Sequence, residues 1–448
     1  MAGLGGGVGA IDVAGFCERP AAELVAVEAS RAVTRAGEAD RNFRTLLGSG
    51  TLHAAAVQLT SVTTVLPYVC AGLSAPSVVV ALLVPLFTAG VLGGNIFASR
   101  VLGWSGSIMA LLFGVAVVQA LLVAINATAV AFMPEKVSSY PLLVTAGVLG
   151  LVSGCTGIIM PLLISALLSP ERRAALLLRE AGFGAAIMTL VSAFSAGFLF
   201  SQPANLDDAE LLGIGAAFMA LSTLWFLALR PSGPLTIGES VPTRDVLRRG
   251  FTYLRRQRWF RRFVLTQLLF TSVTLAPMFY AIYSSEALGA DNNKLDNILI
   301  FVGLGLLAGI AVWGFIRRRF HTRGMYLCSA LIAICAAVLC TLMQIFRLLP
   351  PVWIFGLAML LVAVASQAVG PAMLDWVFSE TAEEDRVVVV SYTQIIDSVA
   401  AIVLGFIFGF VAGYGSAMWP LAIILGVNVA ALCAAMLVRM PRTAPATA

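Results

Sequence analysis

Charged residues are scarce in this chain of 448 residues, because Asp, Glu, Lys and Arg together make up only 11% of it. A soluble domain carries about 25%, so the composition excludes an ordinary soluble protein. Instead, 60% of the residues are hydrophobic, and apolar runs recur from residue 45 to residue 438. Many of these runs approach the roughly 20 residues that cross a bilayer core of about 30 Å. The spans must be helices, because lipid offers no partner to free backbone groups.

Several signatures of chemistry are also missing. The seven cysteines are scattered and form no CxxC pair, which argues against a disulfide framework or a metal site. The sequence contains no recognisable set of catalytic residues for acyl transfer and no phosphate-binding loop. The early glycine-rich stretch "GLGGGVG" is not counted as such a loop, because no predicted strand precedes it. We therefore expect a protein that is not an enzyme and that needs no cofactor or metal.

Twelve apolar segments are predicted to cross the membrane, which makes the fold an all-α polytopic one. Their approximate bounds are 45–70, 76–99, 105–131, 139–168, 175–200, 209–229, 262–285, 295–317, 324–346, 351–378, 388–412 and 415–438. The fourth and the tenth are long, which indicates tilt or extension beyond the membrane.

The placement of arginine predicts the orientation of these spans. With twelve crossings, most arginines near the span ends fall on one side, and the other side holds mainly Lys136, Lys294 and Arg347 with several carboxylates. The arginines of the first side are Arg19, Arg31, Arg35, Arg41, Arg44, Arg100, Arg172, Arg173, Arg317, Arg318, Arg319, Arg323, Arg386, Arg439 and Arg442. The positive-inside rule then places both termini in the cytoplasm.

Polar segments divide the chain into predicted units. Residues 1–40 and 441–448 are expected to be cytosolic tails, and 41–230 and 262–440 to be two six-helix bundles. The linker 231–261 contains "RDVLRRGFTYLRRQRWFRRF". It reads either as an amphipathic helix on anionic lipid or as an ordinary basic loop. Positive-inside topology already explains the net charge of +5, so no nucleic-acid partner is expected.

A hydroxyl-rich motif occurs twice. The letters Thr-Ser-Val-Thr stand at Thr60–Thr63 in the first predicted span and at Thr271–Thr274 in the seventh, 211 residues apart. In both places a Gln precedes the motif and a Pro follows it. We expect both copies to lie in helices.

A second match links the fourth and tenth predicted spans. "SGCTGIIMPLLISALLSPERR" and "SQAVGPAMLDWVFSETAEEDR" align at a constant offset of 213 residues. The aligned pairs are Ser153 with Ser366, Gly157 with Gly370 and Arg173 with Arg386. Both halves hold six spans and point the same way, so the sequence predicts a parallel repeat about an axis along the membrane normal.

Six plus six spans, cytosolic termini and a basic central linker resemble the major facilitator superfamily over residues about 41–440. The stretch "SPERRAALLLREAGFGAA" resembles the family's turn between its fourth and fifth helices. The signature after the second helix is only partly kept in "GGNIFASRVLGWSGS", where Ser99 stands in the place of the usual Asp. The resemblance implies alternating access, with two halves rocking around a substrate near mid-membrane. In the absence of an ATP-binding loop, a gradient would drive transport.

The resemblance also implies that the first, fourth, seventh and tenth helices line the substrate site. The polar residues that we expect there are Gln58, Thr60, Ser61, Thr64, Gln267, Thr271, Thr274, Tyr280, Ser366 and Gln367. Amide and hydroxyl groups suit neutral polar ligands. The alternative is that Ser and Thr bond their own helix and pack closely against neighbouring helices.

Ionisable residues within predicted spans are functional candidates, because a central Asp costs about 2.5–3.5 kcal/mol on insertion scales. Asp397 follows Arg386 by eleven residues, which is roughly 15 Å into the membrane. We expect Asp397 to carry protons or to act as a counter-ion for the substrate, with Glu180 and His53 as further candidates for proton coupling. A buried structural hydrogen bond is the alternative for Asp397 and for His53.

Four other charges are predicted to act at a gate, and they are Arg179, Asp375, Arg173 and Arg386. For Arg179 and Glu180 an ion pair at the inner gate is an equally good interpretation.

The sequence therefore predicts a monomeric secondary transporter of a bacterial inner membrane, with small-molecule substrate, protons and lipid as partners. Proton-coupled export of an amphipathic or neutral compound is the first hypothesis. A nutrient importer of the same fold is the second, and a non-transporting membrane scaffold or sensor is the third.

Overall fold

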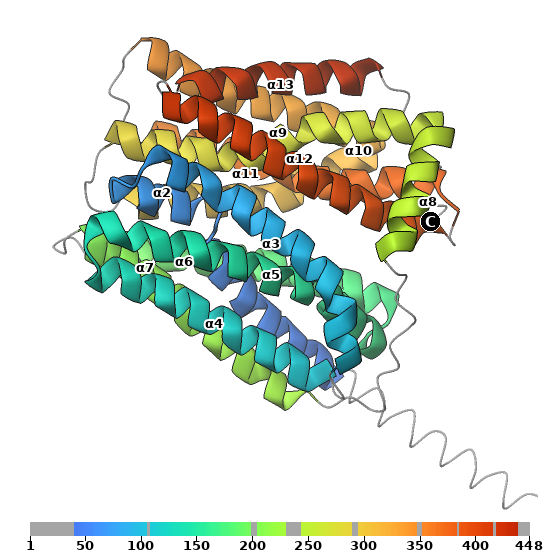
Figure 1. The fold of residues 1–448 in the computed structure, drawn as a ribbon, viewed down its shortest axis with the longest axis horizontal. Helices are drawn as coiled ribbons and strands as arrows, with labels where there is room; N and C mark the ends of the chain where they lie inside the picture. The colour runs from blue at the N-terminus through green and yellow to red at the C-terminus, as the bar shows by residue number, and fades with distance from the viewer. Residues whose placement is uncertain are drawn as a thin grey trace, which may run out of the picture.

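The computed structural model describes residues 40–104, 108–198, 204–229, 243–288, 294–346, 352–382, 385–414 and 418–437. Within these ranges the chain is helical apart from short turns, and most helices run along the long axis of the molecule (Figure 1). Residues 1–39 of the predicted N-terminal tail and the whole predicted C-terminal tail lie outside the described residues.

The N-terminal half holds a first helix over residues 40–59, followed by α2 (Val65–Gly72), α3 (Ser77–Trp104), α4 (Ile108–Phe132), α5 (Glu135–Leu167), α6 (Pro170–Phe198), α7 (Ala204–Trp225) and the 3₁₀ turn η1 (Phe226–Ala228). The linker contributes α8 (Thr243–Arg256). The C-terminal half holds α9 (Arg258–Leu288), α10 (Lys294–Ile345), α11 (Val352–Glu380), α12 (Arg386–Tyr414) and α13 (Met418–Leu437).

Ten helices among the described residues are long and apolar enough to cross a membrane. One of them, Leu295–Met343, has 49 residues, and a straight helix of that length would reach about 74 Å. It turns back at His321, whose φ is 55°, and both of its ends lie in the same buried cluster. It therefore makes two crossings. The first predicted span is also present, divided between the helix 40–59 and α2. The described helices thus make the twelve predicted crossings.

The ends of α5 and α11 show the internal repeat in three dimensions. The two helices end 213 residues apart, which is the offset of the sequence match. After α5, Arg173 Nε donates to the Leu168 carbonyl at 2.8 Å. After α11, Arg386 Nε donates to the Thr381 carbonyl at 3.4 Å. Each arginine thus reaches five residues back to a helix end whose last carbonyls lack intrahelical donors.

Glycine lets α3 and α5 approach until their backbones touch. A Cβ atom on Gly154 would lie 2.9 Å from Asn95 N and 3.0 Å from Gly94 Cα. Gly90 and Gly150 meet the backbone of the opposite helix in the same way. The same close approach occurs in the C-terminal half, where a Cβ on Gly305 of α10 would lie 2.7 Å from the Leu360 carbonyl oxygen of α11.

Buried apolar residues form three clusters, and their membership shows how the halves meet. One cluster combines both halves, from Leu59 to Ile424. The second contains only residues 246–435, and the third only residues 46–229. The shared cluster lies at the end of the helices away from α8, where the Ser285 hydroxyl donates to the Tyr68 carbonyl at 3.3 Å. The halves are therefore packed together at that end and packed separately at the α8 end.

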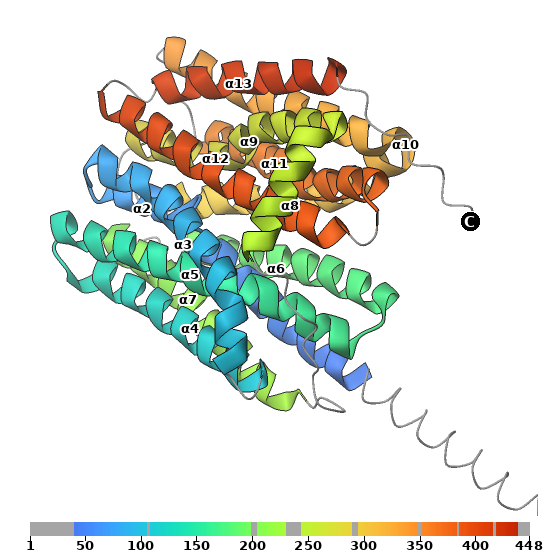
Figure 2. The ribbon, with the colours of Figure 1, turned by 45° about the vertical axis from the view of Figure 1, so that its right-hand side comes forward.

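Three pairs of helices carry most of the contact between the halves, and α2 packing against α9 is one of them. The helix α3 packs against α12, and α6 packs against α10. In Figure 2 the N-terminal half, in blue and green, lies below the C-terminal half, in yellow to red. Gly405 of α12 is close enough to Pro85 of α3 that a Cβ would lie 2.6 Å from its ring.

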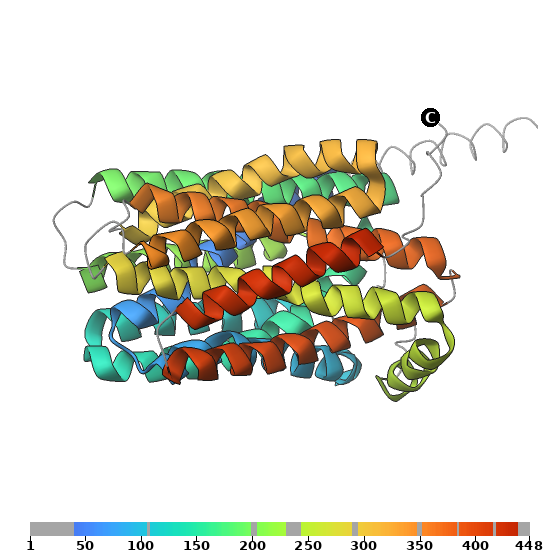
Figure 3. The same cartoon turned by 90° about the horizontal axis from the view of Figure 1, so that it is seen from above.

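Helix α8 lies across one end of the bundle, as Figures 1 and 3 show. Its buried Val246 and Gly250 face the C-terminal half, where Gly250 meets the ring of Tyr392. The Tyr253 hydroxyl donates to Asp385 Oδ2 at 2.7 Å. This hydrogen bond and the partly buried setting raise the pKa of Tyr253 to about 12. The hydrogen bond from Tyr253 thus ties α8 to the start of α12.

Candidate functional site

The first Thr-Ser-Val-Thr copy interrupts the first span, which the sequence had predicted to be one continuous helix. Residues 60–64 are turns between the helix 40–59 and α2. In the break, the Ser61 hydroxyl and the Thr63 hydroxyl are 3.0 Å apart, and Ser61 Oγ also accepts from the Thr63 backbone N–H at 3.3 Å. Hydroxyl side chains thus satisfy backbone groups that the helix no longer pairs. The second copy, at Thr271–Thr274, stays within α9.

Irregular backbone at membrane depth is tolerated where it is buried in protein or lines a cavity, and here it lines one. A cavity of about 180 Å³ lies between the two halves beside the break. Its lining residues are Gln58, Ser61, Thr63, Thr64, Thr274, Pro277, Val302, Leu306, Met359, Val362, Ala363 and Ser366. The N-terminal half thus contributes mainly hydroxyl groups, and α9, α10 and α11 contribute mainly apolar walls.

Five of the ten predicted substrate-binding residues line this central cavity, namely Gln58, Ser61, Thr64, Thr274 and Ser366. The other lining residues include Val302 and Leu306 of α10 and Met359, Val362 and Ala363 of α11. Sequence reasoning did not find these five, because an apolar residue in an apolar span carries no signal that separates a cavity wall from a lipid contact.

The other predicted substrate residues lie outside the lining of the central cavity. Thr60 donates to the Ala56 carbonyl and packs toward Gly215 of α7. Thr271 donates to the carbonyl of Gln267 at 3.2 Å. The Gln367 amide donates to the Leu306 carbonyl at 3.0 Å and so joins α11 to α10.

Tyr280 also lies outside that lining. It is 1% exposed, and its hydroxyl has no hydrogen-bond partner among the described residues.

Asp397 lies in a polar network within the C-terminal half. The Gln267 amide donates to Asp397 Oδ2 at 3.2 Å, and Gln267 Oε1 accepts from the Tyr326 hydroxyl at 3.1 Å. The other carboxylate oxygen, Oδ1, is buried without a hydrogen-bond partner in the part of the chain that the structure describes. The network joins α9, α10 and α12. Gln267 therefore positions Asp397, while one oxygen stays available for a proton.

The predicted gating charges have varied surroundings. Asp375 accepts from Arg317 at 2.8 Å, which joins α11 to α10 near the α8 end. The guanidinium of Arg179 lies over the ring of Phe43, 5.8 Å from its centroid. Within the described ranges no ion pair joins Arg179 to Glu180 in this conformation. Arg173 and Arg386 bind helix-end carbonyls, as described above.

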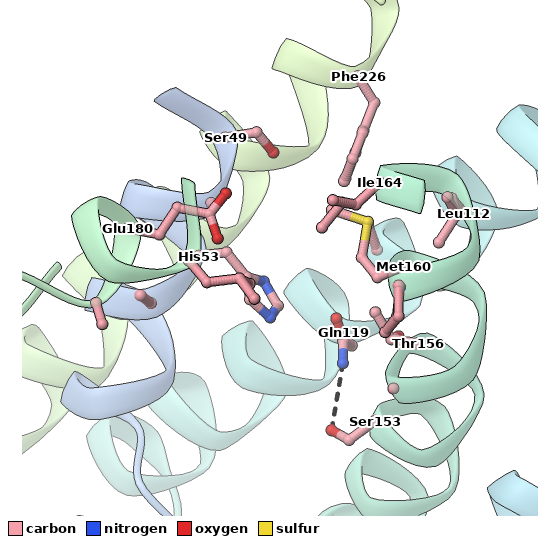
Figure 4. Close-up of a pocket in the computed structure, with 17 residues that line it drawn as sticks. Ser49, His53, Leu112, Gln119, Ser153, Thr156, Met160, Ile164, Glu180 and Phe226 are labelled. Carbon is pink, nitrogen blue, oxygen red and sulfur yellow. Dashed lines mark hydrogen bonds between the residues drawn. The ribbon is translucent and has the colours of Figure 1, made fainter. Parts of the chain in front are cut away.

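Glu180 and His53 line a second cavity, of about 440 Å³, inside the N-terminal half. Figure 4 shows both side chains entering it from one side, with Met160 and Ile164 on the other. No residue of its lining is shared with the central cavity.

Cysteine labelling should separate the lining of the central cavity from its surroundings. In a variant without the seven native cysteines, we expect Ser61→Cys and Ser366→Cys to react with a membrane-impermeant maleimide. Thr60→Cys should stay unreactive because Thr60 faces α7. Labelling is read by mass spectrometry on membranes opened from both sides. Equal labelling of residues 60 and 61 would contradict the geometry of the break.

Comparison with known proteins gives two kinds of similarity. A sequence model described as Major Facilitator Superfamily matches residues 46–404. An uncharacterized protein of Mycobacterium tuberculosis is 31% identical over 413 residues, which cover 91% of this chain and 79% of that protein. An uncharacterized protein of Mycobacterium bovis matches to the same extent.

Solved structures share the architecture. A variant of the nucleoside transporter NupG matches with a TM-score of 0.67 and 14% identity, covering 88% of this chain and 98% of that one. The xylose transporter XylE from E. coli, in a partially occluded inward open conformation, matches with a TM-score of 0.64 and 14% identity. That match covers 90% of this chain and 100% of the other. At such low identity these matches show a common fold.

Proposed function

The chain belongs to the major facilitator superfamily and is a secondary transporter, and from that premise we propose that it exports an amphipathic or neutral small molecule in exchange for protons. The observation that supports this most is the central cavity, where the broken first span meets Thr274 and Ser366 of the other half. Hydroxyl and amide groups face apolar walls there, and none of the described residues that line this cavity is charged. Such a lining suits a ligand with apolar surface and a few neutral polar groups.

The orientation is part of the proposal. We infer that the α8 end faces the cytoplasm, because Arg172, Arg317, Arg386 and the arginines of α8 belong to helix ends gathered there (Figure 1). The membrane would be the cytoplasmic membrane of a bacterium, in keeping with the mycobacterial relatives. With the halves packed together at the opposite end, this conformation would be open to the cytoplasm. An exporter would load its substrate in this state.

Proton movement is proposed to use Asp397. Its buried, unpartnered Oδ1 can take up a proton, and Gln267 holds the other oxygen. Neutralising this carboxylate removes the penalty of a charge in a low-dielectric region. It would thereby change the balance between conformations that expose α12 to one side or the other.

The test of this function measures whether movement of a substrate across the membrane is coupled to movement of protons. Inverted membrane vesicles containing the protein are acidified inside by respiration, and candidate compounds are added one at a time. For proton antiport, a substrate should release part of the gradient, seen as recovery of acridine-orange fluorescence, only when the protein is present. A nutrient symporter would instead carry protons and substrate out of these vesicles together, and radiolabelled substrate shows which way it moves. A scaffold or sensor would give no response to any compound.

Helix α8 is proposed to rest on anionic lipid. Arg248, Arg249 and Arg255 are exposed, and so are the apolar Leu247 and Phe251. A helix with these two properties binds a membrane surface through buried apolar area and through attraction to negative headgroups. Each arginine near the surface contributes about 1 kcal/mol.

The lipid contact predicts a composition-dependent stability. In nanodiscs, wild-type protein should unfold at a higher temperature with phosphatidylglycerol than with phosphatidylcholine. Arg248→Gln combined with Arg249→Gln should remove much of that difference, because it removes two cationic groups from the exposed face. High salt should also reduce the difference in unfolding temperature, because it screens the attraction between the arginines and the anionic headgroups. An undiminished difference in the double variant would show that α8 does not provide the lipid contact.

A further inference from the structure

In the cavity inside the N-terminal half, most of the polar groups have hydrogen-bond partners in the protein, and one buried carboxylate oxygen has none among the described residues. The cavity is lined by residues of the helix 40–59, α4, α5 and α6 and by Phe226 of η1. The Gln119 amide donates to the Ser153 hydroxyl at 3.3 Å, as the dashed line in Figure 4 shows. Thr156 donates to the Val152 carbonyl at 2.9 Å. These polar groups are therefore satisfied by the protein itself.

Glu180 differs from these groups. Its Oε1 atom is buried and has no hydrogen-bond partner among the described residues. The guanidinium of the neighbouring Arg179 lies over the ring of Phe43. The absence of a side chain on Gly50 gives Glu180 its place, because a Cβ there would meet the carboxylate. An unpaired carboxylate in a low-dielectric site is strongly destabilising, so its surroundings favour a cationic partner.

The lining opposite Glu180 includes several apolar side chains. Leu112, Met160, Ile164 and Phe226 surround the space opposite Glu180, and the volume of about 440 Å³ is within the range of small-molecule sites. His53 adds a flat ring beside the carboxylate (Figure 4). Leu177 is 56% exposed and lies at the wall formed by α6. The cavity thus combines one anionic acceptor with walls that suit an aliphatic or aromatic body.

We propose that this N-terminal cavity is a second binding site, separate from the central one, for an organic cation in which a protonated amine is attached to an apolar body. The ammonium group binds Glu180, and the body packs against Met160, Ile164 and Phe226. A neutral apolar molecule fills the same walls but leaves the carboxylate unpaired, so the site distinguishes the two. This proposal concerns binding, and it does not depend on the direction or the proton coupling of transport.

Binding is tested on the purified full chain in nanodiscs with two fluorescent probes. Dansylcadaverine carries a primary ammonium group, and N-pentyl dansylamide is its neutral counterpart. We expect saturable binding of dansylcadaverine with a blue-shifted emission, at least tenfold tighter than binding of the neutral probe. The Glu180→Gln substitution should weaken the binding affinity for the cationic probe at least tenfold. The affinity for the neutral probe should not change.

A second pair of variants locates the probe. A Cβ on Gly157 would meet nothing within 4 Å, and Gly157 lines this cavity. Gly157→Leu should therefore fill the space and abolish binding. Gly370, its counterpart in the repeat, is equally open and lies in the other half, so Gly370→Leu should leave binding unchanged. Size-exclusion profiles verify that both variants are folded.

Three results would overturn the proposal. These are equal affinity of the two probes, undiminished binding of dansylcadaverine by Glu180→Gln, and equal losses in Gly157→Leu and Gly370→Leu. The last would place the probe outside the N-terminal cavity. If Gly157→Leu does not fold, the comparison of the two probes on wild type and Glu180→Gln still decides the question. Loss of binding with intact proton-coupled transport would leave the proposed function standing.

Discussion

Replacing Asp397 by asparagine is expected to abolish proton-driven transport while substrate exchange across the membrane continues. Asparagine has nearly the same shape, and its carbonyl oxygen can still accept the hydrogen bond from Gln267. It cannot alternate between a charged and a neutral form. A proton that moves with the field releases about 2.3 kcal/mol per 100 mV. Without a group that binds and releases the proton, this free energy cannot drive the conformational change.

The measurement uses proteoliposomes. Counterflow of labelled substrate, which needs no proton, should stay within about twofold of wild type, and accumulation driven by a pH gradient should vanish. Asp245→Asn is the matched control, because Asp245 is an exposed carboxylate in the first turn of α8. If Asp397→Asn transports with an unchanged pH dependence, Asp397 is structural, and Glu180 or His53 becomes the next proton-coupling candidate.

Replacing Gly154 by leucine is expected to prevent assembly of the N-terminal half. A Cβ at this position would already lie 2.9 Å from the Asn95 nitrogen and 3.0 Å from Gly94 Cα, both on the backbone of α3. Backbone cannot rotate aside as a side chain can, so the two helices must separate. Overpacking a core costs about 1–3 kcal/mol, and a larger side chain against backbone should exceed that range.

Gly157→Leu is the matched control for Gly154→Leu, because it makes the same substitution on the same helix at a position with no atom within 4 Å. Thermal unfolding and the monodisperse fraction on size exclusion are measured for both. We expect Gly154→Leu to lose most of its monodisperse protein and Gly157→Leu to resemble wild type. Equal behaviour of the two variants would mean that α3 and α5 tolerate separation.

The sequence by itself determined the class, the twelve crossings and the pairing of the two halves. These properties depend on local composition, on the length of apolar runs and on an offset between repeated motifs, all of which can be read along the chain. The offset of 213 residues reappears in the ends of α5 and α11 and in the carbonyls bound by Arg173 and Arg386.

Only the tertiary structure decided which polar side chains face a cavity. Gln58 and Gln267 both precede the repeated motif in the sequence, yet Gln58 lines the central cavity and Gln267 binds Asp397 and Tyr326. The same four letters end a helix at Thr60 and continue one at Thr271. The motif permits either outcome, because its hydroxyls can bond their own helix or a turn. Packing against the rest of each half selects between them.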